Sequence, residues 1–231
     1  MASDFRKLNI IVCVVVLLSI VFVLTRPIHP EPFRMYLKEN GDTFVTTTDF
    51  SSVPETVVSD AFRRAQYLYG NNEKAVENFT AQLVGSYIEC QTTDTVIIFN
   101  PGGFGWDGVE DSEGWLTIMQ GITGIITETG RDVKVFNYKR SHPGFTGMMS
   151  EATTLFGLNE SKAQELAVRV DFLTFNLPDL NIIITGESNG CVVVEEAIQQ
   201  LENNSQVYSI QTGPPVIQRT IDLEHSLVLR H

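Results

Sequence analysis

The sequence NIIITGESNGCVVVEEAI, residues 181–198, places a short apolar run before a glycine–serine–glycine turn and a second apolar run after it. A run rich in β-branched residues that stops at a glycine predicts a buried strand, and the pattern over 190–201 predicts a helix. Gly186 and Gly190 lie two positions before and two positions after Ser188. The stretch therefore predicts a sharp strand-to-helix turn with Ser188 at its tip.

The same alternation of short apolar runs and helical patterns continues through the rest of the chain. We expect strands over 95–100, 132–138, 180–186 and 206–213, the beginning of another over 226–231, and helices over 57–69, 73–88, 113–129, 159–176 and 190–201. Unbroken apolar strands separated by helices are typical of a parallel sheet whose two faces are both covered. The expected fold class is therefore α/β, a mostly parallel sheet with helices on both faces.

The N-terminal part contains an uncharged apolar run, LNIIVCVVVLLSIVFVLT, over residues 8–25. At a rise of about 1.5 Å per residue, a helix of this length nearly crosses a hydrocarbon core of about 30 Å. Arg6 and Lys7 precede the run, which predicts that the N-terminus is cytoplasmic. An uncleaved signal anchor and a cleavable signal peptide are the alternatives. The lack of a small-x-small cleavage site after the run favours the anchor.

These features give an expected organisation for a single-pass membrane protein. Residues 1–7 would be cytoplasmic, 8–25 would form the transmembrane signal anchor, the proline-rich segment 26–40 would be a linker, and 41–231 would be an extracytoplasmic domain. Asn-x-Ser/Thr sequons, which are compatible with export, begin at Asn78, Asn159 and Asn203.

Charge and cysteine content exclude several classes of partner and cofactor. The net charge of −12 argues against nucleic acid as a partner, because phosphate binding needs a basic surface. Cys13, Cys90 and Cys191 fit no zinc or redox spacing. We favour two isolated thiols at Cys90 and Cys191, and a disulfide between them is the alternative. No metal or cofactor is expected, because we interpret the acidic residues near the first glycine-rich loop as helix N-terminal charges: Asp107, Glu110, Asp111 and Glu113.

The turn around Ser188 matches the G-x-S-x-G nucleophile elbow, with a strand before it and a helix after it. In such a turn the serine has a strained backbone, and the positions two before and two after it crowd the neighbouring chain, so both favour glycine. The backbone N–H of Asn189, at the positive end of the helix, would face a developing oxyanion. The alternative is an ordinary turn between a strand and a helix.

A second glycine-rich loop, in VIIFNPGGFGWDG over 96–108, directly follows the predicted strand 95–100. Glycines let the backbone approach a substrate closely, so the N–H groups of Gly103 and Phe104 are candidate oxyanion donors. No Lys-Ser/Thr follows, which excludes a P-loop, and the spacing is not that of a dinucleotide fingerprint. Trp106 and Trp115 flank this loop, and we interpret them as core or rim residues rather than as the lining of an acyl pocket.

Taken together, the two loops resemble the α/β-hydrolase superfamily over residues 95–213, about half of the chain. The resemblance implies that Ser188 is a nucleophile and that the N–H groups of Asn189 and of Gly103 or Phe104 form an oxyanion hole. It also implies hydrolysis of an ester, thioester or amide through an acyl-enzyme. Asn100-Pro101 stands where many members carry His-Gly, so the loop is a variant.

The acid and the histidine of a triad follow the serine in chain order in this superfamily. The candidates downstream are Asp222, Glu224, His225 and His231. Glu224 and His225 are adjacent, and on an extended strand they would face opposite sides. His142 precedes the serine and is a further candidate, because triads are recognised by geometry; the alternative is a solvated loop histidine. We expect a member truncated before the strand and helix that would complete the pattern.

The sequence therefore supports two hypotheses. The first is a membrane-anchored serine hydrolase that acts on a small-molecule or lipid acyl substrate through Ser188. The second is an inactive or truncated homologue that serves as a membrane-tethered binding module. A nucleotide-binding α/β protein is a weaker third alternative. Glu187, next to the serine, is expected to point to solvent rather than to tune the elbow.

Overall fold

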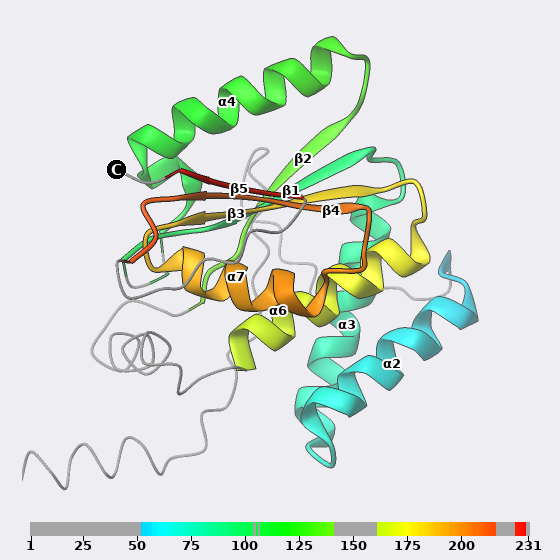
Figure 1. Cartoon of the computed structure of the whole chain (residues 1–231). Helices are drawn as coiled ribbons and strands as arrows, with labels where there is room; N and C mark the ends of the chain where they lie inside the picture. The colour runs from blue at the N-terminus through cyan, green and yellow to red at the C-terminus, as the bar shows by residue number, and fades with distance from the viewer. Residues whose placement is uncertain (1–51, 104, 106, 141–160, 216–224, 230–231) are drawn as a thin grey trace, which may run out of the picture. The chain divides into compact units, whose positions relative to one another are not determined.

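A parallel sheet forms the centre of the protein, shown in Figure 1. The computed structural model describes residues 52–103, 105, 107–140, 161–215 and 225–229. Its strands are β1 (Thr95–Asn100), β2 (Val133–Asn137), β3 (Asn181–Glu187), β4 (Val207–Thr212) and β5 (Ser226–Leu229). They lie in the order β2-β1-β3-β4-β5, and every neighbouring pair is parallel. The parallel sheet predicted from the sequence is therefore confirmed.

Helices lie on both faces of this sheet, also as predicted. They are α2 (Glu55–Tyr69), α3 (Glu73–Cys90), α4 (Glu113–Glu128), α6 (Ser161–Asn176) and α7 (Gly190–Gln200), with a short 3-10 turn η2 (Val109–Asp111). Figure 1 shows α4 on one face and α6 and α7 on the other, with α2 and α3 packed beyond α6. Right-handed crossovers explain this division, because the step from β1 to β2 runs opposite to the later steps along the sheet.

The apolar strands bury side chains on both faces, which separates the core into two clusters. All six residues of β1 are buried. Because side chains alternate along a strand, Val96 and Ile98 join the larger cluster with α6 and α7, whereas Ile97 and Phe99 face α4. Trp115 of α4 is 2% exposed and packs on Phe99, with ring centroids 5.3 Å apart. The prediction that Trp115 is a core residue is confirmed.

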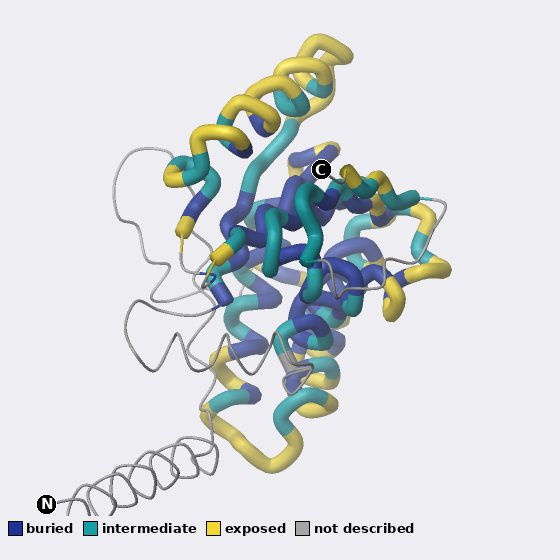
Figure 2. Tube along the Cα trace, turned by 60° about the vertical axis from the view of Figure 1, so that its left-hand side comes forward, coloured by how far each residue is buried: buried dark blue, intermediate teal, exposed yellow. Residues whose placement is uncertain are grey.

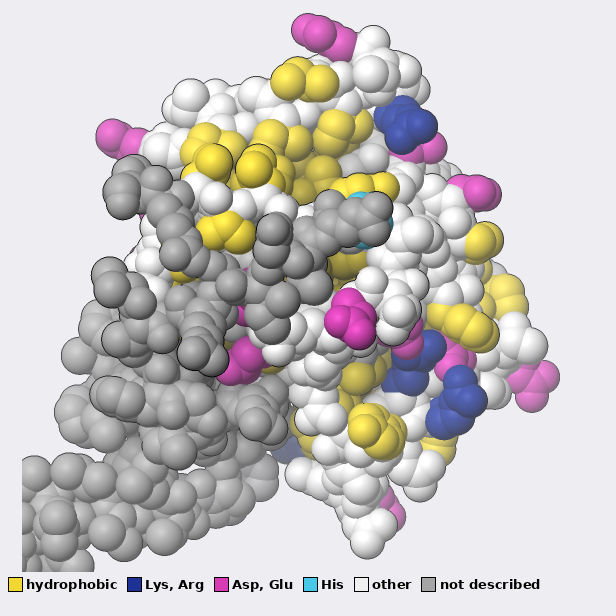
Figure 3. Space-filling view, in the orientation of Figure 1, with side chains coloured by type: hydrophobic (Ala, Val, Ile, Leu, Met, Phe, Trp, Pro, Cys, Tyr) yellow, Lys and Arg dark blue, Asp and Glu magenta, His cyan; other side chains and the backbone are white. Residues whose placement is uncertain are grey.

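Helix α4 is much less buried than the strands it covers, as Figure 2 shows. Its only buried residues are Trp115 and Met119, whereas Ile125 is 67% exposed. In Figure 3 hydrophobic side chains gather over α4. Leu227 and Leu229 of β5 are also about half exposed. Among the described residues, the α4 side of the sheet therefore has the thinner cover.

None of the helices in the described ranges has the length and the apolar composition needed to cross a membrane. The expected anchor at 8–25, the linker at 26–40 and residues 41–51 lie outside those ranges. The anchor therefore stays a prediction from the sequence.

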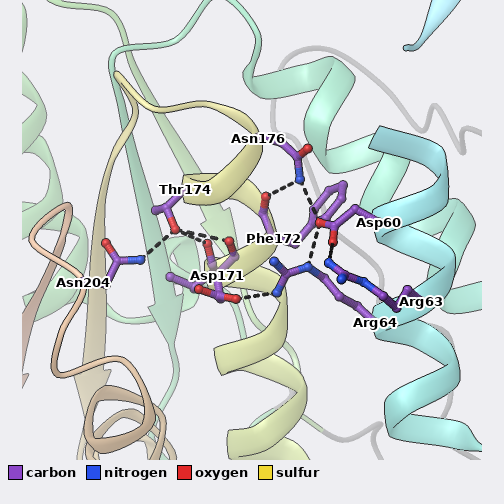
Figure 4. A network of polar contacts seen from close by, with 9 residues as sticks. Asp60, Arg63, Arg64, Asp171, Phe172, Thr174, Asn176 and Asn204 are labelled. Atoms are coloured by element: carbon purple, nitrogen blue, oxygen red, sulfur yellow. Dashed lines mark hydrogen bonds and ion pairs between the residues drawn. The ribbon is translucent and has the colours of Figure 1, made fainter. Parts of the chain in front are cut away.

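A buried carboxylate holds α2 against α6, as Figure 4 shows. Asp60 is 6% exposed and accepts hydrogen bonds from Arg63 Nη2 (2.5 Å), Arg64 Nε (2.7 Å) and Asn176 Nδ2 (3.0 Å). Arg64 also pairs with Asp171 of α6. Burial by itself would raise the pKa of Asp60, but the bonds from Arg64, Arg63 and Asn176 outweigh it and lower that pKa below its ordinary value.

We expect Asp60→Asn to lower the free energy of unfolding at pH 7 by about 1–3 kcal/mol, because Arg64 loses a carboxylate partner. The pKa of Asp60 is lower in the folded than in the unfolded state. Its contribution is therefore complete above the unfolded pKa, about 3.9, and is lost as pH falls through the folded pKa. Urea unfolding of the wild type and of Asp60→Asn should be measured at pH 7 and at a pH below the folded pKa of Asp60. The difference in their free energies of unfolding should be larger at pH 7 than in acid.

The matched control is Asp179→Asn, which changes an exposed carboxylate in the turn after α6. It should leave the free energy of unfolding within about 0.5 kcal/mol of the wild type, as surface substitutions usually do. Equal stability of Asp60→Asn and wild type at pH 7 would show that the network does not join the two helices.

Candidate active site

The carboxyl ends of three parallel strands meet at one edge of the sheet. Asn100 at the end of β1 is paired with Gly186, and Glu187 at the end of β3 is paired with Thr212 of β4. Because the strands are parallel and in this register, the glycine-rich loop after β1 and the turn after β3 lie side by side. The register therefore brings together the two loops that the sequence singled out, although 85 residues separate Gly102 from Glu187.

Ser188 has a strained backbone, with φ at +47°. Among the described residues it is the only non-glycine residue with a positive φ. An L-residue in this left-handed region costs about 1–2 kcal/mol. Two backbone hydrogen bonds fix the turn: Ser188 N–H donates to Thr212 O (2.9 Å), and Cys191 N–H donates to Ser188 O (3.0 Å). The strained geometry expected at this serine is therefore present.

The two flanking glycines lie where no side chain fits. A Cβ on Gly190 would lie 2.3 Å from the carbonyl oxygen of Asn100 and 2.8 Å from that of Pro101. A Cβ on Gly186 would lie 3.0 Å from the backbone N and Cα of Cys191. The elbow thus packs directly against the end of β1. This contact is the physical reason for glycine at position 190, and the close approach of Gly186 to the start of α7 is the reason at position 186, as the sequence predicted.

A buried arginine supports the glycine-rich loop from the side of β2. Arg140 is 3% exposed, its Nη1 donates to Pro101 O (2.7 Å), and its backbone N–H donates to Gly105 O (2.8 Å). Gly105 has φ at +75°, and a Cβ there would lie 2.9 Å from Arg140 Nη2. Arg140 was not among the residues predicted from the sequence. Its position two residues after Tyr138, at the end of a strand, was the available signal.

Two of the predicted oxyanion donors are in residues that touch each other. The side-chain Nδ2 of Asn189 donates to Gly103 O at 3.1 Å. Within the described part of the chain, neither Gly103 N–H nor Asn189 N–H has a hydrogen-bond acceptor. A pair of unsatisfied N–H groups beside a serine can stabilise an oxyanion. The contact between Asn189 and Gly103 brings the residues of two predicted donors together, and their role as oxyanion donors stays a prediction.

The side chain of Glu187 does not point to solvent, which corrects the expectation from the sequence. It is half-buried, and its Oε2 accepts a hydrogen bond from Gly102 N–H at 3.4 Å. Its Oε1 accepts one from Ser112 Oγ at 3.2 Å. Both partners are distant in the sequence and reach Glu187 through the pairing of β1 with β3, which is why the inward direction of this side chain depends on tertiary structure.

The structure places His225, one of the candidates for the triad, away from Ser188. The carbonyl of His225 accepts a hydrogen bond from Ser209 N–H, and Thr212 is paired with Leu229. His225 thus lies four residues before the level of Thr212, or about 13 Å along the strand at 3.3 Å per residue. Ser188 lies at the Thr212 end of the sheet, so His225 is not brought to it.

The remaining candidates from the sequence lie outside the described residues. They are Phe104, Trp106, His142, Asp222, Glu224 and His231. Phe104 as a donor, and the others as base, acid or rim residues, therefore stay predictions.

The thiols and the acidic residues near the loop take structural roles. Cys90 and Cys191 are both buried and are not bonded to each other, and burial raises the pKa of each to about 12. Asp111 accepts a hydrogen bond from Gly108 N–H (2.9 Å), and Glu110 accepts one from Asn137 Nδ2 (3.0 Å). Within the described residues no group of three or more His, Cys, Asp or Glu residues could hold a metal ion.

Comparison with known proteins gives little further guidance. No protein-family model and no curated protein matches the chain. Among solved structures, a Trichoderma reesei cutinase in complex with a C11Y4 phosphonate inhibitor is 14% identical, with a TM-score of 0.38 over 79% of this chain and 78% of that chain. A likeness at this level carries no argument about the chemistry of this chain.

We expect Gly190→Ala to destabilise the protein by about 1–3 kcal/mol or more, because the added methyl group overlaps the carbonyl oxygens of Asn100, the last residue of β1, and of Pro101, the residue after it. Gly124→Ala is the matched control. Gly124 lies within α4 with nothing within 4 Å of an added Cβ, so alanine there should stabilise by about 0.5–1 kcal/mol. Urea unfolding of both variants checks the pair. A neutral Gly190→Ala would contradict the close contact.

Proposed function

We propose that this protein is a serine hydrolase of the α/β-hydrolase type, which cleaves an ester, thioester or amide through an acyl-enzyme on Ser188. The observation that carries the proposal is the positive φ of Ser188. Every other positive-φ residue in the described ranges is a glycine, the residue that adopts this conformation without strain. A serine that costs stability at the tip of a strand-to-helix turn is best explained by its hydroxyl.

The proposed chemistry begins with attack of Ser188 Oγ on the acyl carbonyl carbon. A bond forms between Oγ and that carbon, the carbonyl π electrons move to oxygen, and the hydroxyl proton passes to a general base. The N–H groups of Gly103 and Asn189 would donate to the oxyanion. When the carbonyl re-forms, the leaving group departs with a proton, and water then repeats the sequence to free the acid. His225 lies away from Ser188, so His142 and His231 stay the candidates for the base.

A binding module without catalysis is the second candidate function. The observation that favours it is that His225, the only histidine among the described residues, lies away from Ser188. Without a base the serine hydroxyl is a weak nucleophile. The same elbow and loop would then hold an acyl compound without cleaving it.

We expect a fluorophosphonate probe to label the wild-type protein covalently and to leave Ser188→Ala unlabelled. Ser188→Gly should also remain unlabelled. Its free energy of unfolding should be about 1 kcal/mol higher than that of Ser188→Ala, because glycine adopts the left-handed conformation without the Cβ penalty. In-gel fluorescence and urea unfolding measure the two effects. A glycine variant that is more stable than the alanine variant but takes up no probe would show that Ser188 serves the chemistry and not the folding of the turn.

Ser205→Ala, which removes an exposed hydroxyl after α7, is the control and should label like the wild type. Folded wild-type protein that takes up no probe would end the hydrolase proposal and favour the binding module.

We further propose that residues 8–25 anchor this domain to a membrane with residues 41–231 on the extracytoplasmic side. The support is the uncharged apolar run behind Arg6 and Lys7. The full chain should stay with membranes after carbonate washing, and deletion of residues 1–25 should release it, since the uncharged, predominantly apolar run at 8–25 supplies the insertion energy. If expression of the full-length sequence instead yields a soluble protein that is shortened at its N-terminus, the run is a cleaved signal peptide.

A further inference from the structure

We infer that Glu187 and Asn189, the two residues on either side of Ser188, are positioning residues that lock the glycine-rich loop to the nucleophile elbow. The inference rests on the proposed function, because it assigns these side chains a task in the oxyanion site of that reaction. Neither side chain touches the reacting atoms. Each acts through the backbone of the loop, which supplies the N–H group of Gly103.

The loop needs external support because of its composition. Gly102, Gly103 and Gly105 have no side chains with which to anchor it, and glycine has the widest backbone freedom of any residue. An unsupported loop would sample many directions for its N–H groups. An oxyanion hole works only when its donors are fixed before the charge develops. Some other part of the molecule must therefore restrict this loop.

Glu187 holds the first glycine of the loop. Its Oε2 accepts the hydrogen bond from Gly102 N–H at 3.4 Å, and a Cβ on Gly102 would come within 3.3 Å of Glu187 Cγ. The same carboxylate accepts the hydroxyl of Ser112, which directly precedes α4, at 3.2 Å. One side chain thus joins the elbow, the loop and the start of the helix that follows the loop.

Asn189 holds the next peptide of the same loop. Its Nδ2 donates to Gly103 O at 3.1 Å, and the carbonyl of Gly102 accepts a hydrogen bond from Gly105 N–H at 3.1 Å. A trans peptide is planar, and its C=O and N–H point in opposite directions. Because Gly102 O is turned to Gly105, Gly103 N–H must point the other way. The bonds from Gly102 N–H to Glu187 and from Asn189 to Gly103 O therefore fix the peptides before and after the one that carries Gly103 N–H.

The division of roles around the loop follows from these bonds. Arg140 binds Pro101 O and Gly105 O, so it fixes the two ends of the loop from the side of β2. Glu187 and Asn189 fix the middle from the side of β3. Since they flank the nucleophile in sequence, any movement of the elbow carries the loop with it. The distance between nucleophile and oxyanion donor is thereby kept constant.

The test compares Glu187→Ala, Glu187→Gln and Asn189→Ala in the full chain by two measurements. The first is the rate of fluorophosphonate labelling at Ser188. We expect Glu187→Ala and Asn189→Ala to slow it about 10- to 100-fold, the effect of roughly 1 Å of misplacement in a catalytic geometry. Glu187→Gln keeps an amide oxygen that can accept from Gly102 N–H, so it should retain most of the wild-type rate.

The second measurement is hydrogen exchange of the amides at 102–105, with the amides of α6 as the internal reference. Exchange at 102–105 should accelerate in both alanine variants and not in α6, whereas a variant that merely unfolds would accelerate both. Glu202→Gln and Asn203→Ala, exposed changes in the turn after α7, are the matched controls and should leave labelling and exchange unchanged.

The outcomes separate this inference from the proposed function. If both alanine variants label at the wild-type rate, the positioning role is overturned while the hydrolase proposal stands. If the wild-type protein takes up no probe, the hydrolase proposal fails, and hydrogen exchange at 102–105 is then the only test of the positioning role. Unchanged exchange at 102–105 would then overturn the positioning role, and faster exchange confined to that loop would support it.

Discussion

The close packing of the elbow against the end of β1 is the constraint on which the rest of the site depends. The backbone at Gly190 approaches the carbonyl oxygens of Asn100 and Pro101 so closely that a Cβ would lie 2.3 Å from the first of them. This contact requires β1 and β3 to be adjacent and in register, which the pairing of Asn100 with Gly186 provides. It also sets how far the glycine-rich loop lies from Ser188.

A strained residue survives only where the surrounding structure determines its conformation. At Ser188 the determining contacts are backbone hydrogen bonds to Thr212 of β4 and from Cys191 of α7. Both partners belong to elements with buried apolar faces, so the sheet and its helices supply the free energy that holds the strained turn. The core and the site are thus linked, because packing between the sheet and α7 stabilises a backbone conformation that serine alone would not adopt.

The loop opposite the serine shows the reverse relation between sequence and conformation. Its glycines impose almost nothing, and its shape comes from polar contacts supplied by Arg140, Glu187 and Asn189. Hydrogen bonds that involve a charged group contribute more than neutral ones, and two of these three side chains are charged. The loop therefore has a defined path because side chains from β3 and from beyond β2 bind its backbone.

The sequence by itself determined the strands, the helices, their parallel arrangement and the glycine spacing around Ser188, because these follow from local periodicity and from steric rules about single residues. Only the tertiary structure decided that Glu187 turns inward, that Arg140 lies under the loop and that His225 lies far from the serine. Each of these depends on the pairing or close approach of segments distant in sequence. Hydrophobic pattern indicates that a strand exists, but the level at which β5 pairs with β4 is set by contacts across the sheet.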